Sequence, residues 1–475
     1  MNEPESAAKK VNADLIRRYN VSGPRYTSYP TALQFAPYSE SDFKEAVAAS
    51  RSALEIPSTE KPGNANDDLS VYVHIPFCAT LCYYCACNKI VTKKREPAIE
   101  YLALLKQELA MVAPLFEGRV VSQLHWGGGT PTFFDDDQLL ELMDALKSAF
   151  DFRSDDEGEF GIEIDPRTVD AERVAYLRKC GFNRLSFGIQ DFNPVVQKAV
   201  NRIQTYEQTE EILEAARANG FESISVDLIY GLPHQSVSSF DETLKQIIEL
   251  RPDRVSIFNY AHLPERFSPQ KRILISDLPG PDEKLDILGL CIERLTSAGY
   301  VYIGMDHFAL PDDELAVAQR EGTLHRNFQG YSTYADCDLL ALGVTGISNI
   351  GNTYSQNVKE LDAYREKLVS GSIPVEKGVM IDNDDQIRKA VINALICQFE
   401  LDFEKIEHAF GIDFQTYFAN ELDTLKPMVA DELLAVSPGE IKVLESGRLL
   451  IRNICMVFDR YITSSDGTQA FSKAI

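Results

Sequence analysis

The chain has 475 residues, 44% of them hydrophobic and 25% charged, which is ordinary for a globular protein and long enough for about three domains. Its formal net charge of −25 argues against general attraction to nucleic acid or to an anionic membrane, so we expect it to bind no nucleic acid. No apolar signal-peptide core begins the chain, and no run of about eighteen apolar residues predicts membrane insertion. Nine cysteines, odd in number and clumped, favour a reducing compartment, and we expect a cytoplasmic monomer.

Residues 1–65 predict an N-terminal arm and linker with few periodic apolar segments. Residues 22–31 contain two prolines and a glycine, which favour an extended conformation over a helix. Residues 58–68, rich in Pro, Gly, Asn and Asp, predict a loop that joins the arm to the next domain. We expect residues 19–36 to fold over the mouth of that domain as part of a lid.

Four cysteines lie within sixteen residues, directly after the first predicted strand at 69–75. Cys78, Cys82 and Cys85 have the spacing C-x3-C-x2-C, and Cys87 follows two positions later. Thiolates this close together can share one metal centre, and cysteine sulfur is the usual ligand of iron–sulfur clusters. Three ligands leave one iron of a [4Fe–4S] cluster free to bind a small molecule. A structural zinc site is the alternative, but zinc takes four ligands, typically in two separated C-x2-C pairs, and the second pair is missing.

From residue 69 onwards, predicted strands alternate with predicted helices, one of which begins at the capping box Thr205-x-x-Gln208 and ends at Gly220. Such alternation predicts an α/β fold with parallel strands and right-handed crossovers. Six units are too few for a closed eight-fold barrel, so we expect an incomplete (β/α)6 TIM-like barrel. The predicted strands are 69–75, 120–126, 159–165, 184–190, 223–229 and 254–259.

Polar or glycine-rich residues follow each of the six predicted strands at its C-terminal end. In folds of this class the chemistry lies beyond those ends of the strands. Residues 300–380 carry further strings of this kind, so we expect 66–380 to form a catalytic barrel and its extension. The strings that close or follow the strands are 78–87, 126–132, 163–166, 188–191, 227–233 and 259–264.

Residues 381–475 predict a mainly helical C-terminal domain with a hairpin around Pro438 and Gly439. Helices followed by a hairpin resemble a winged helix. We do not expect this domain to bind DNA, because the chain as a whole is acidic.

From about Tyr19 to the C-terminus, the chain resembles the oxygen-independent coproporphyrinogen III oxidases, also called coproporphyrinogen III dehydrogenases, of the radical S-adenosylmethionine (SAM) superfamily. The cysteine spacing alone marks only the superfamily. The fourth cysteine, Cys87, together with the strings PRYTSYPT and HRNFQGY, narrows the resemblance to this family. The other strings that carry it are HIPFCATLCYYCACNK, LHWGGGTPT, FNRLSFGIQDFN, VDLIYGLP and GRLLIRNIC.

The resemblance implies an oxidoreductase of anaerobic haem biosynthesis, which converts two propionate side chains of coproporphyrinogen III to vinyl groups and releases protoporphyrinogen IX and CO2. It implies a [4Fe–4S] cluster on Cys78, Cys82 and Cys85 and two SAM molecules per chain. An electron from the cluster splits SAM into methionine and a 5′-deoxyadenosyl radical, which takes a hydrogen atom from the propionate and becomes 5′-deoxyadenosine. An electron donor such as flavodoxin or ferredoxin, and an electron acceptor, are implied as well.

The resemblance also implies which residues hold the two SAM molecules. Glycines let backbone N–H groups approach a ligand, carboxylates suit ribose hydroxyls or an amino group, and arginine suits a carboxylate. The expected cofactor-binding residues, besides Cys85, are Tyr72, Gly128, Glu163 and Ile347 for the first SAM, and Tyr84, Gly129, Thr130, Gln190, Arg202, Asp227 and Ala261 for the second.

Two further residues near the cluster are candidates for catalysis. Cys87 lies outside the ligand triad and is either a functional thiol facing the cavity or a packed cysteine. His74 precedes the first ligand by four residues and either serves the cluster, in proton or electron transfer, or is a satisfied structural histidine. Because the substrate carries four propionates, it needs cations. The candidates are Arg25, Arg326, Arg448 and Arg452, and the alternative is that these arginines pair with local acids.

Two other functions remain open from the sequence. The first is a haem-binding, chaperone-like relative in the same superfamily, although such proteins typically lack the fourth cysteine and the N-terminal arm. The second is a zinc-stabilised interaction protein with a winged-helix tail.

Overall fold

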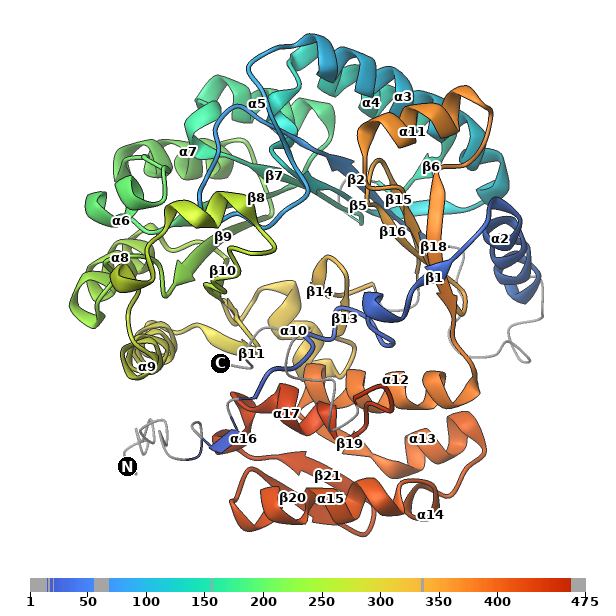
Figure 1. The fold of residues 1–475 in the computed structure, drawn as a ribbon, viewed down its shortest axis with the longest axis vertical. Coiled ribbons are helices and arrows are strands. Elements are labelled where there is room, and N and C mark those ends of the chain that lie inside the picture. The colour runs from blue at the N-terminus through green and yellow to red at the C-terminus, as the bar shows by residue number, and fades with distance from the viewer. Residues whose placement is uncertain are drawn as a thin grey trace.

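The computed structural model describes Leu15 and residues 18–19, 21–54, 68–154, 157–334 and 337–462. A curved sheet wrapped by helices forms the larger part of the molecule, and a smaller helical unit lies beneath the open side of that sheet (Figure 1). Of the linker predicted at 58–68, residues 58–67, and with them the predicted boundary after residue 65, lie outside the described residues, whereas Asp68 already begins strand β2 because it pairs with Val120. Across these described stretches, no helix combines the length and the apolar character that crossing a bilayer requires.

Six parallel strands form the centre of the sheet, each hydrogen-bonded to the next in chain order. Their order and direction confirm the predicted (β/α) alternation, and their bounds differ from the predicted ones by at most two residues. Buried side chains line both faces of the first strand, as expected for a strand covered by helices on one side and by a filled interior on the other. The strands are β2 (Asp68–Ile75), β5 (Val120–Gly128), β7 (Glu159–Ile164), β8 (Arg184–Gln190), β9 (Ser223–Tyr230) and β10 (Arg254–Asn259).

Helices cover the outer face of these strands (Figure 1). The helix predicted from Thr205 does begin there with a capping box, and it ends at Ala218, just before Gly220, whose φ of 73° favours glycine. The helix that follows Asp135 buries one apolar face, formed by Leu139, Leu142, Met143 and Leu146, and Asp135 caps that helix. The helices are α3 (Glu96–Val112), α4 (Asp136–Ala149), α5 (Ala171–Cys180), α6 (Pro194–Ala199), α7 (Tyr206–Ala218), α8 (Val237–Leu250) and α9 (Pro281–Ser297).

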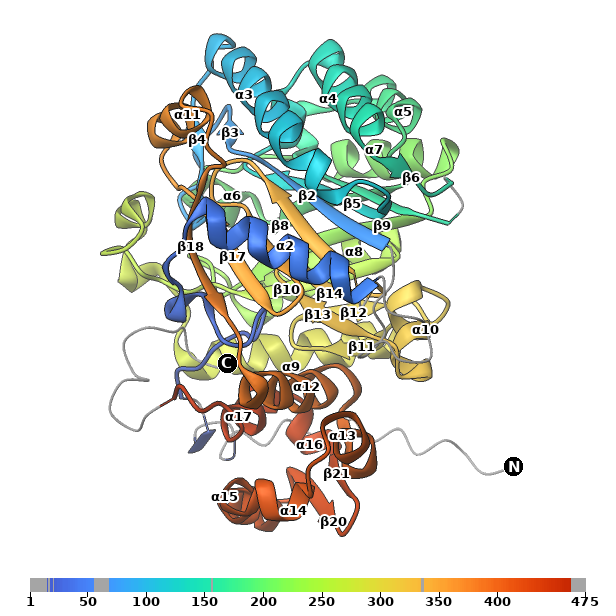
Figure 2. The same ribbon diagram turned by 90° about the vertical axis from the view of Figure 1, so that its right-hand side faces the viewer.

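The extension predicted at 300–380 adds strands to both edges of the sheet, which therefore grows well beyond the six predicted strands. On one edge β15 runs parallel to β2, and antiparallel strands continue to the N-terminal β1; on the other edge two antiparallel strands follow β10. Helix α2 (Glu40–Leu54) lies across the outside of the first edge (Figure 2). The added elements are β11 (Val301–Gly304), β12 (His307–Ala309), α10 (Glu314–Glu321), β15 (Asp338–Leu342), β16 (Ile347–Ile350), β17 (Thr353–Asn357), α11 (Leu361–Val369), β18 (Val375–Met380) and β1 (Ala36–Pro37), together with a separate hairpin of β13 (His325–Asn327) and β14 (Gly330–Ser332).

The last part of the chain is mainly helical, and the predicted hairpin is present, because β20 and β21 pair antiparallel around Pro438 and Gly439. A third strand, β19, pairs with β21. The elements are α12 (Asn383–Gln398), β19 (Glu400–Asp402), α13 (Phe403–Phe410), α14 (Phe414–Tyr417), α15 (Ala419–Ala430), β20 (Leu434–Ser437), β21 (Glu440–Val443), α16 (Glu445–Arg448) and α17 (Ile451–Met456).

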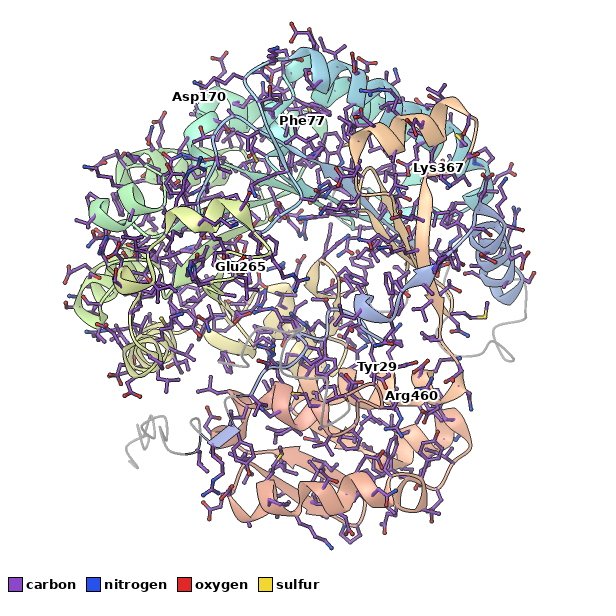
Figure 3. The ribbon with its side chains drawn as sticks, viewed as in Figure 1. Tyr29, Phe77, Asp170, Glu265, Lys367 and Arg460 are labelled. Carbon is purple, nitrogen blue, oxygen red and sulfur yellow. The ribbon has the colours of Figure 1, made fainter. Side chains whose placement is uncertain are left out.

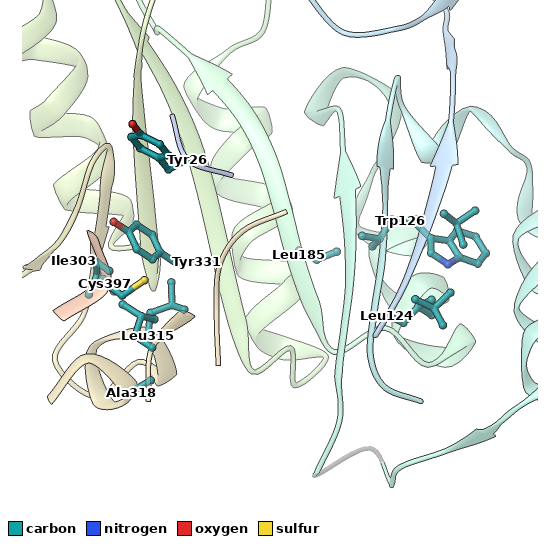
Figure 4. Packing of buried hydrophobic residues seen from close by; sticks show 14 of the residues in the cluster. Tyr26, Leu124, Trp126, Leu185, Ile303, Leu315, Ala318, Tyr331 and Cys397 are labelled. Atoms are coloured by element: carbon teal, nitrogen blue, oxygen red, sulfur yellow. The ribbon is translucent and has the colours of Figure 1, made fainter. Parts of the chain in front are cut away.

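The helical part packs directly against the extended sheet. The Tyr331 hydroxyl donates to the carbonyl of Ile396 at 3.1 Å, and Tyr331 lies next to Ile303 and Cys397 in one apolar cluster (Figure 4). Because the core continues from β14 into α12 without a polar layer, the two parts share one hydrophobic core.

The N-terminal arm runs between the sheet and the helical part. Tyr26 donates to Asp459 at 3.1 Å, and the hydroxyl of Tyr29 accepts from the backbone N–H of Arg460 at 3.1 Å, so that Tyr29 and Arg460 lie side by side (Figure 3). Residues 22–31 form no helix, as their prolines predict, but they bend at residues 27–30 instead of running straight. Buried tyrosines anchor this part of the arm.

Candidate functional site

The four clustered cysteines lie in the loop that follows β2. Residues Phe77–Cys78 (β3) pair with Ile90–Val91 (β4), which closes this loop at its base over the C-terminal ends of β2 and β5. Cys82 is buried, Cys78 and Cys85 are half-buried, and Cys87 is exposed. The loop thus presents all four thiols at the end of the sheet where chemistry is expected.

Hydrogen-bond donors surround two of the three triad sulfurs. The Thr130 hydroxyl donates to the Cys78 sulfur at 3.7 Å, while Arg167 and Arg202 donate to the Cys82 sulfur at 3.6 and 3.7 Å. Donors of this kind stabilise thiolate ligands and tune a metal centre.

The donor set of this loop fits an iron–sulfur cluster. Burial raises the pKa of Cys78 to about 11, so this thiol stays protonated at neutral pH without a bound cation. A bound metal would stabilise it as a thiolate. Three thiols in one loop, with cationic donors directed at Cys82, match the ligands that an iron–sulfur cluster takes. Within the described part of the chain, no three His, Cys, Asp or Glu side chains are grouped so that they would hold a single metal ion.

A cavity of about 230 Å³ is lined by His74, whose ring contacts the carbonyl of Asn88 at the end of this loop. Three of the four residues expected to line the first SAM, namely Tyr72, Glu163 and Ile347, line this cavity. The backbone N–H of the fourth, Gly128, donates to Glu163 at 3.2 Å. The other lining residues are His74, His125, Phe328, Gln329, Leu339 and Thr345.

The two glycines that end β5 are required by the close approach of two side chains. A Cβ atom on Gly127 would lie 2.8 Å from a carboxylate oxygen of Glu163, and one on Gly128 would lie 2.6 Å from the ring of His74. Gly128 also has a φ of 112°, which other residues rarely adopt. The sequence therefore carries glycine at these positions so that Glu163 and His74 can reach the end of the strand.

An aromatic and acidic layer forms one wall of the cavity. Tyr72 stacks on His125 with ring centroids 6.1 Å apart, and His125 Nε2 lies 3.3 Å from Glu163 Oε1. Burial alone raises the pKa of Glu163, but the hydrogen bond and positive potential of His125 hold that pKa below its usual value. Glu163 is therefore an ionised acceptor that faces the cavity.

Both ring nitrogens of His74 have partners. Nδ1 lies 3.1 Å from the Tyr72 hydroxyl, and Nε2 lies 3.1 Å from the carbonyl oxygen of Asn88. Burial lowers the pKa of His74, which keeps the ring neutral. These contacts give His74 a structural role between β2 and the end of the cysteine loop, and its catalytic role stays a prediction.

The residues expected around the second SAM gather at the ends of β7 to β10. Arg202 is buried, pairs with Asp165 at 3.4 Å and also donates to the carbonyl of Gly188. Its Nε, like Oε1 of Gln190, is buried and has no hydrogen-bond partner among the described residues, so both atoms are available to a ligand. Burial, followed by the charge of Glu163, raises the pKa of Asp227 to about 7.

The other members of this group follow β5, β2 and β10. The backbone N–H of Gly129 donates to Ile75 and that of Thr130 donates to Phe77, both at 2.8 Å, so these residues bridge β5 to the start of the cysteine loop. The carbonyl oxygen of Tyr84 accepts from Gln270 at 3.0 Å. Ala261 is half-buried directly beyond β10.

Three of the four candidate substrate arginines lie close together, between the arm and the sheet. Arg326 donates to the backbone carbonyl of Arg25 at 3.3 Å, and Arg25 pairs with Asp306. Arg452 donates to the backbone carbonyls of Gly23 and Pro24. Burial, reinforced by the neighbouring arginines, lowers the pKa of Arg25 to about 9 and that of Arg452 to about 10.

These three arginines make a site with excess positive charge. Arg326 is buried, and its Nη1 has no hydrogen-bond partner in the described stretches. An anion would neutralise the repulsion that lowers the pKa of Arg25 and of Arg452. The fourth candidate, Arg448, lies apart from them, 3.3 Å from Glu445 and over the ring of Phe399, so it matches the alternative of pairing with a local acid.

Comparison with known proteins gives the family of the chain. Residues 72–247 match the radical SAM superfamily, and residues 381–450 match the HemN C-terminal domain. The chain is 52% identical to the oxygen-independent coproporphyrinogen III oxidase of Pseudomonas aeruginosa, over 98% of each chain, and 52% identical to that of Escherichia coli, over 97% of this chain and 98% of the other. The solved structure of coproporphyrinogen III oxidase (HemN) from Escherichia coli, a radical SAM enzyme, superposes with a TM-score of 0.88 at 50% identity, covering 96% of this chain and 100% of the other. The chain therefore belongs to the oxygen-independent coproporphyrinogen III oxidase family, within the radical SAM superfamily.

Proposed function

We propose that this chain converts two propionate side chains of coproporphyrinogen III to vinyl groups, releasing CO2 and protoporphyrinogen IX without using oxygen. The observation that carries the proposal is the grouping of three thiols in the loop after β2, a strand whose Tyr72 lines a cavity together with Glu163 and Ile347, in a chain of this family. The haem-binding relative is the weaker candidate, because this chain has both the arm and Cys87.

The cofactors of this reaction are a [4Fe–4S] cluster and two SAM molecules. Cys78, Cys82 and Cys85 would hold the cluster, and when bound the cluster and SAM together supply the radical that removes a hydrogen atom from the propionate. The protein's part is to bind these groups, to orient them and to keep water from the cavity. Glu163, ionised at the cavity wall, suits the amino group or a ribose hydroxyl of the first SAM.

Two unpartnered polar atoms support the proposal of a second SAM molecule. Arg202 Nε and Gln190 Oε1 offer a cationic donor and a neutral acceptor at the ends of β8 and the segment after α6. Asp227, with its raised pKa, accepts a hydrogen bond or holds a proton near neutral pH.

We also propose a domain division, a location with electron-transfer partners, and a lid. The chain divides into an arm and linker at 1–65, a catalytic barrel with extension at 66–380 and a winged-helix-like domain at 381–475. It acts as a cytoplasmic monomer, receives electrons from flavodoxin or ferredoxin, and passes electrons to an acceptor. Residues 19–36 form part of a lid over the substrate.

Replacing Arg326 or Arg25 by alanine is expected to raise KM for coproporphyrinogen III by about 10- to 100-fold, because each guanidinium–carboxylate hydrogen bond contributes roughly 1.5–3 kcal/mol. The KM for SAM should not change. Steady-state kinetics under anaerobic conditions measures both constants. The control is Arg294→Ala on the outer helix α9, where the arginine pairs with Asp241 on the surface. An unchanged KM for the porphyrinogen in both test variants would reject these arginines as substrate ligands.

Replacing Cys87 by serine is expected to leave the iron content per chain unchanged while turnover falls. Cys87 is the exposed member of the group and lies outside the C-x3-C-x2-C triad, so the cluster does not require it. Iron and sulfide analysis of the anaerobically reconstituted variant gives the first quantity, and protoporphyrinogen formation gives the second. Wild-type turnover with full iron content would assign Cys87 to packing alone.

The direct test of the proposed function is anaerobic incubation of the reconstituted chain with coproporphyrinogen III, SAM and a reductant. We expect protoporphyrinogen IX, 5′-deoxyadenosine and methionine to form together. A parallel incubation with haem tests the alternative. Stable haem binding without formation of any of these three products would replace the enzyme by the chaperone-like function.

A further inference from the structure

The surface around the cysteine loop has a charge opposite to that of the whole chain. The chain carries 72 acidic and 47 basic residues, but residues 69–95 contain no Asp or Glu and end in Lys89, Lys93, Lys94 and Arg95. Residues 192–206 likewise contain no acid, and residues 260–276 contain one acid, Glu265, against three basic residues. Basic charge is therefore concentrated in three segments of an acidic protein.

Hydrogen bonds and one cation–π contact bring these three segments together around the thiols. The backbone N–H of Tyr83 donates to the carbonyl of Val200 at 3.0 Å, and the Asn201 side chain donates to the carbonyl of Leu81 at 2.7 Å. The guanidinium of Arg272 lies over the ring of Tyr83, 5.1 Å from its centroid. The loop after β2 and the segment before α9 lie on the same face of the molecule in both views (Figures 1 and 2).

The same surface exposes several large apolar side chains. Ile203 and Ile275 are 66% and 74% exposed, although neighbouring residues of their segments are buried in a small cluster that includes Val200 and Ile273. Exposed apolar side chains within a basic rim are typical of a protein-binding surface. Val195, Leu263 and Leu274 are exposed on the same segments.

The thiols lie close to this surface. Cys87 and its neighbour Ala86 are exposed, as are Ala79 and Thr80 on the other side of the loop. An electron that arrives at this face would therefore cross little protein before it reached a cluster on the triad. We call this basic surface the rim and define it as the exposed parts of residues 79–95, 195–203 and 263–275.

We propose that the rim docks the reductant of the cluster, a small acidic protein that carries a flavin at its exposed edge. The inference rests on the proposed function, because it places the cluster on Cys78, Cys82 and Cys85. An acidic partner is repelled by the rest of this chain, and the rim is where it is attracted, so the charge pattern selects the productive orientation. The exposed side chains of Ile203 and Ile275 give the apolar edge of a flavin a surface to pack on.

The electron balance of this encounter is simple. The anionic flavin hydroquinone gives one electron and becomes the neutral semiquinone, and the oxidised cluster takes that electron. No proton, atom or further reactant is transferred in this step. The rim therefore needs to supply only proximity and orientation, which charge and apolar contact provide.

The test is a charge reversal at Lys271 and Arg272, which are exposed and which the proposed chemistry does not use. We expect Lys271→Glu/Arg272→Glu to lower the second-order rate constant for cluster reduction by a purified bacterial flavodoxin hydroquinone by about 10- to 100-fold at low ionic strength. Added salt should narrow the difference, because it screens the attraction. Stopped-flow absorbance of the cluster and of the semiquinone measures the rate without relying on turnover.

The control variant is Lys405→Glu/Lys426→Glu, which makes the same charge change on exposed residues of α13 and α15, in the helical part of the chain. It should behave as wild type. A small neutral photoreductant, deazaflavin, should reduce the cluster of all three proteins at equal rates and support equal turnover. This photoreduction experiment separates the two proposals. If photoreduced wild type formed no product, the proposed function would be rejected, but the docking proposal would still stand.

An equal flavodoxin rate constant in the rim variant and the control would overturn the docking proposal. So would loss of the rate constant to the same extent in both variants, since only net charge would then matter. A charge-dependent rate with a ferredoxin but not with flavodoxin would reject the flavin partner. Binding of anionic lipid vesicles by the rim, with no charge dependence of cluster reduction, would make the surface a membrane contact instead.

Discussion

Replacing Cys82 by serine is expected to leave the anaerobically reconstituted protein nearly free of iron and to lower protoporphyrinogen formation by about 10⁴-fold or more, since the cofactor carries the hard step of the reaction. Cys82 is the buried member of the triad and the one whose sulfur receives hydrogen bonds from both Arg167 and Arg202. A serine hydroxyl is a poor ligand for iron in this setting, because it does not ionise as a thiol does. The measurements are iron and acid-labile sulfide per chain, and product formation.

The matched control is serine at Cys180, which is also buried but lies at the end of α5, on the outside of the barrel. That variant makes the same chemical change in a packed site and should keep its iron and its turnover. The comparison separates loss of a ligand from loss of folding. A Cys82→Ser protein that binds as much iron as the Cys180→Ser protein would remove Cys82 from the ligand set and with it the basis of the proposed function.

The fold was predictable in the region where the physical signal is local. Six strands with helices between them each carry their own apolar pattern, and the capping boxes at Asp135 and Thr205 mark helix starts within a few residues. The hairpin at Pro438 and Gly439 is a signal of the same local kind. In these elements burial and local propensity favour the same structure, so sequence reasoning and the structure agree.

The edges of the sheet were not predictable in the same way. Strands β15 to β18 and β1 are short, and their place is decided by pairing partners far away in the chain, such as β2 for β15 and β18 for β1. No periodicity specifies such long-range pairing. The consequence reaches the site, because Thr345 and Ile347 come to the cavity only when β15 pairs with β2.

Phe328 and Gln329 were missed as cavity residues for the same reason. They form the turn of the β13–β14 hairpin, which returns to the cavity from a position outside the six-strand barrel. The string HRNFQGY that contains them is part of the resemblance to the family, and that string was the available signal. The arginines were chosen because they carry charge and lie in the family strings outside the predicted SAM-binding strands. Neither property distinguishes Arg326, whose Nη1 has no partner among the described residues, from Arg448, which lies beside Glu445.

Replacing Glu108 by alanine is expected to destabilise the protein by about 3–5 kcal/mol, the range for breaking a buried hydrogen-bond network. Glu108 lies on α3, is fully buried and accepts hydrogen bonds from three groups of the extension. Asn357 donates to Oε1 at 2.6 Å, the backbone N–H of Gly343 donates to Oε2 at 2.8 Å, and the Tyr364 hydroxyl donates to Oε2 as well. Removing the side chain of Glu108 leaves these three donors buried without an acceptor. The control is Glu100→Ala on the same helix, where the glutamate pairs with Arg365 in solvent. The control should lose much less stability, because an exposed ion pair contributes little.

The destabilisation should also depend on pH, with a sign set by the raised pKa of Glu108. Burial raises that pKa to about 7, from an ordinary value of 4.5, so the folded protein holds a proton that the unfolded chain loses between these values. Wild type therefore loses stability as pH rises from 4.5 through 7, while the alanine variant has no such term. We would measure the midpoint of urea unfolding anaerobically for wild type and for Glu108→Ala at pH 5.5 and at pH 8. The midpoint of wild type should exceed that of the variant by more at pH 5.5 than at pH 8. A difference between wild type and Glu108→Ala that is constant with pH would mean that Glu108 is ionised throughout, held by its three donors. In either case Glu108 fixes Gly343, at the start of the turn that leads to Thr345 and Ile347, so the variant should also bind SAM more weakly than the Glu100→Ala control.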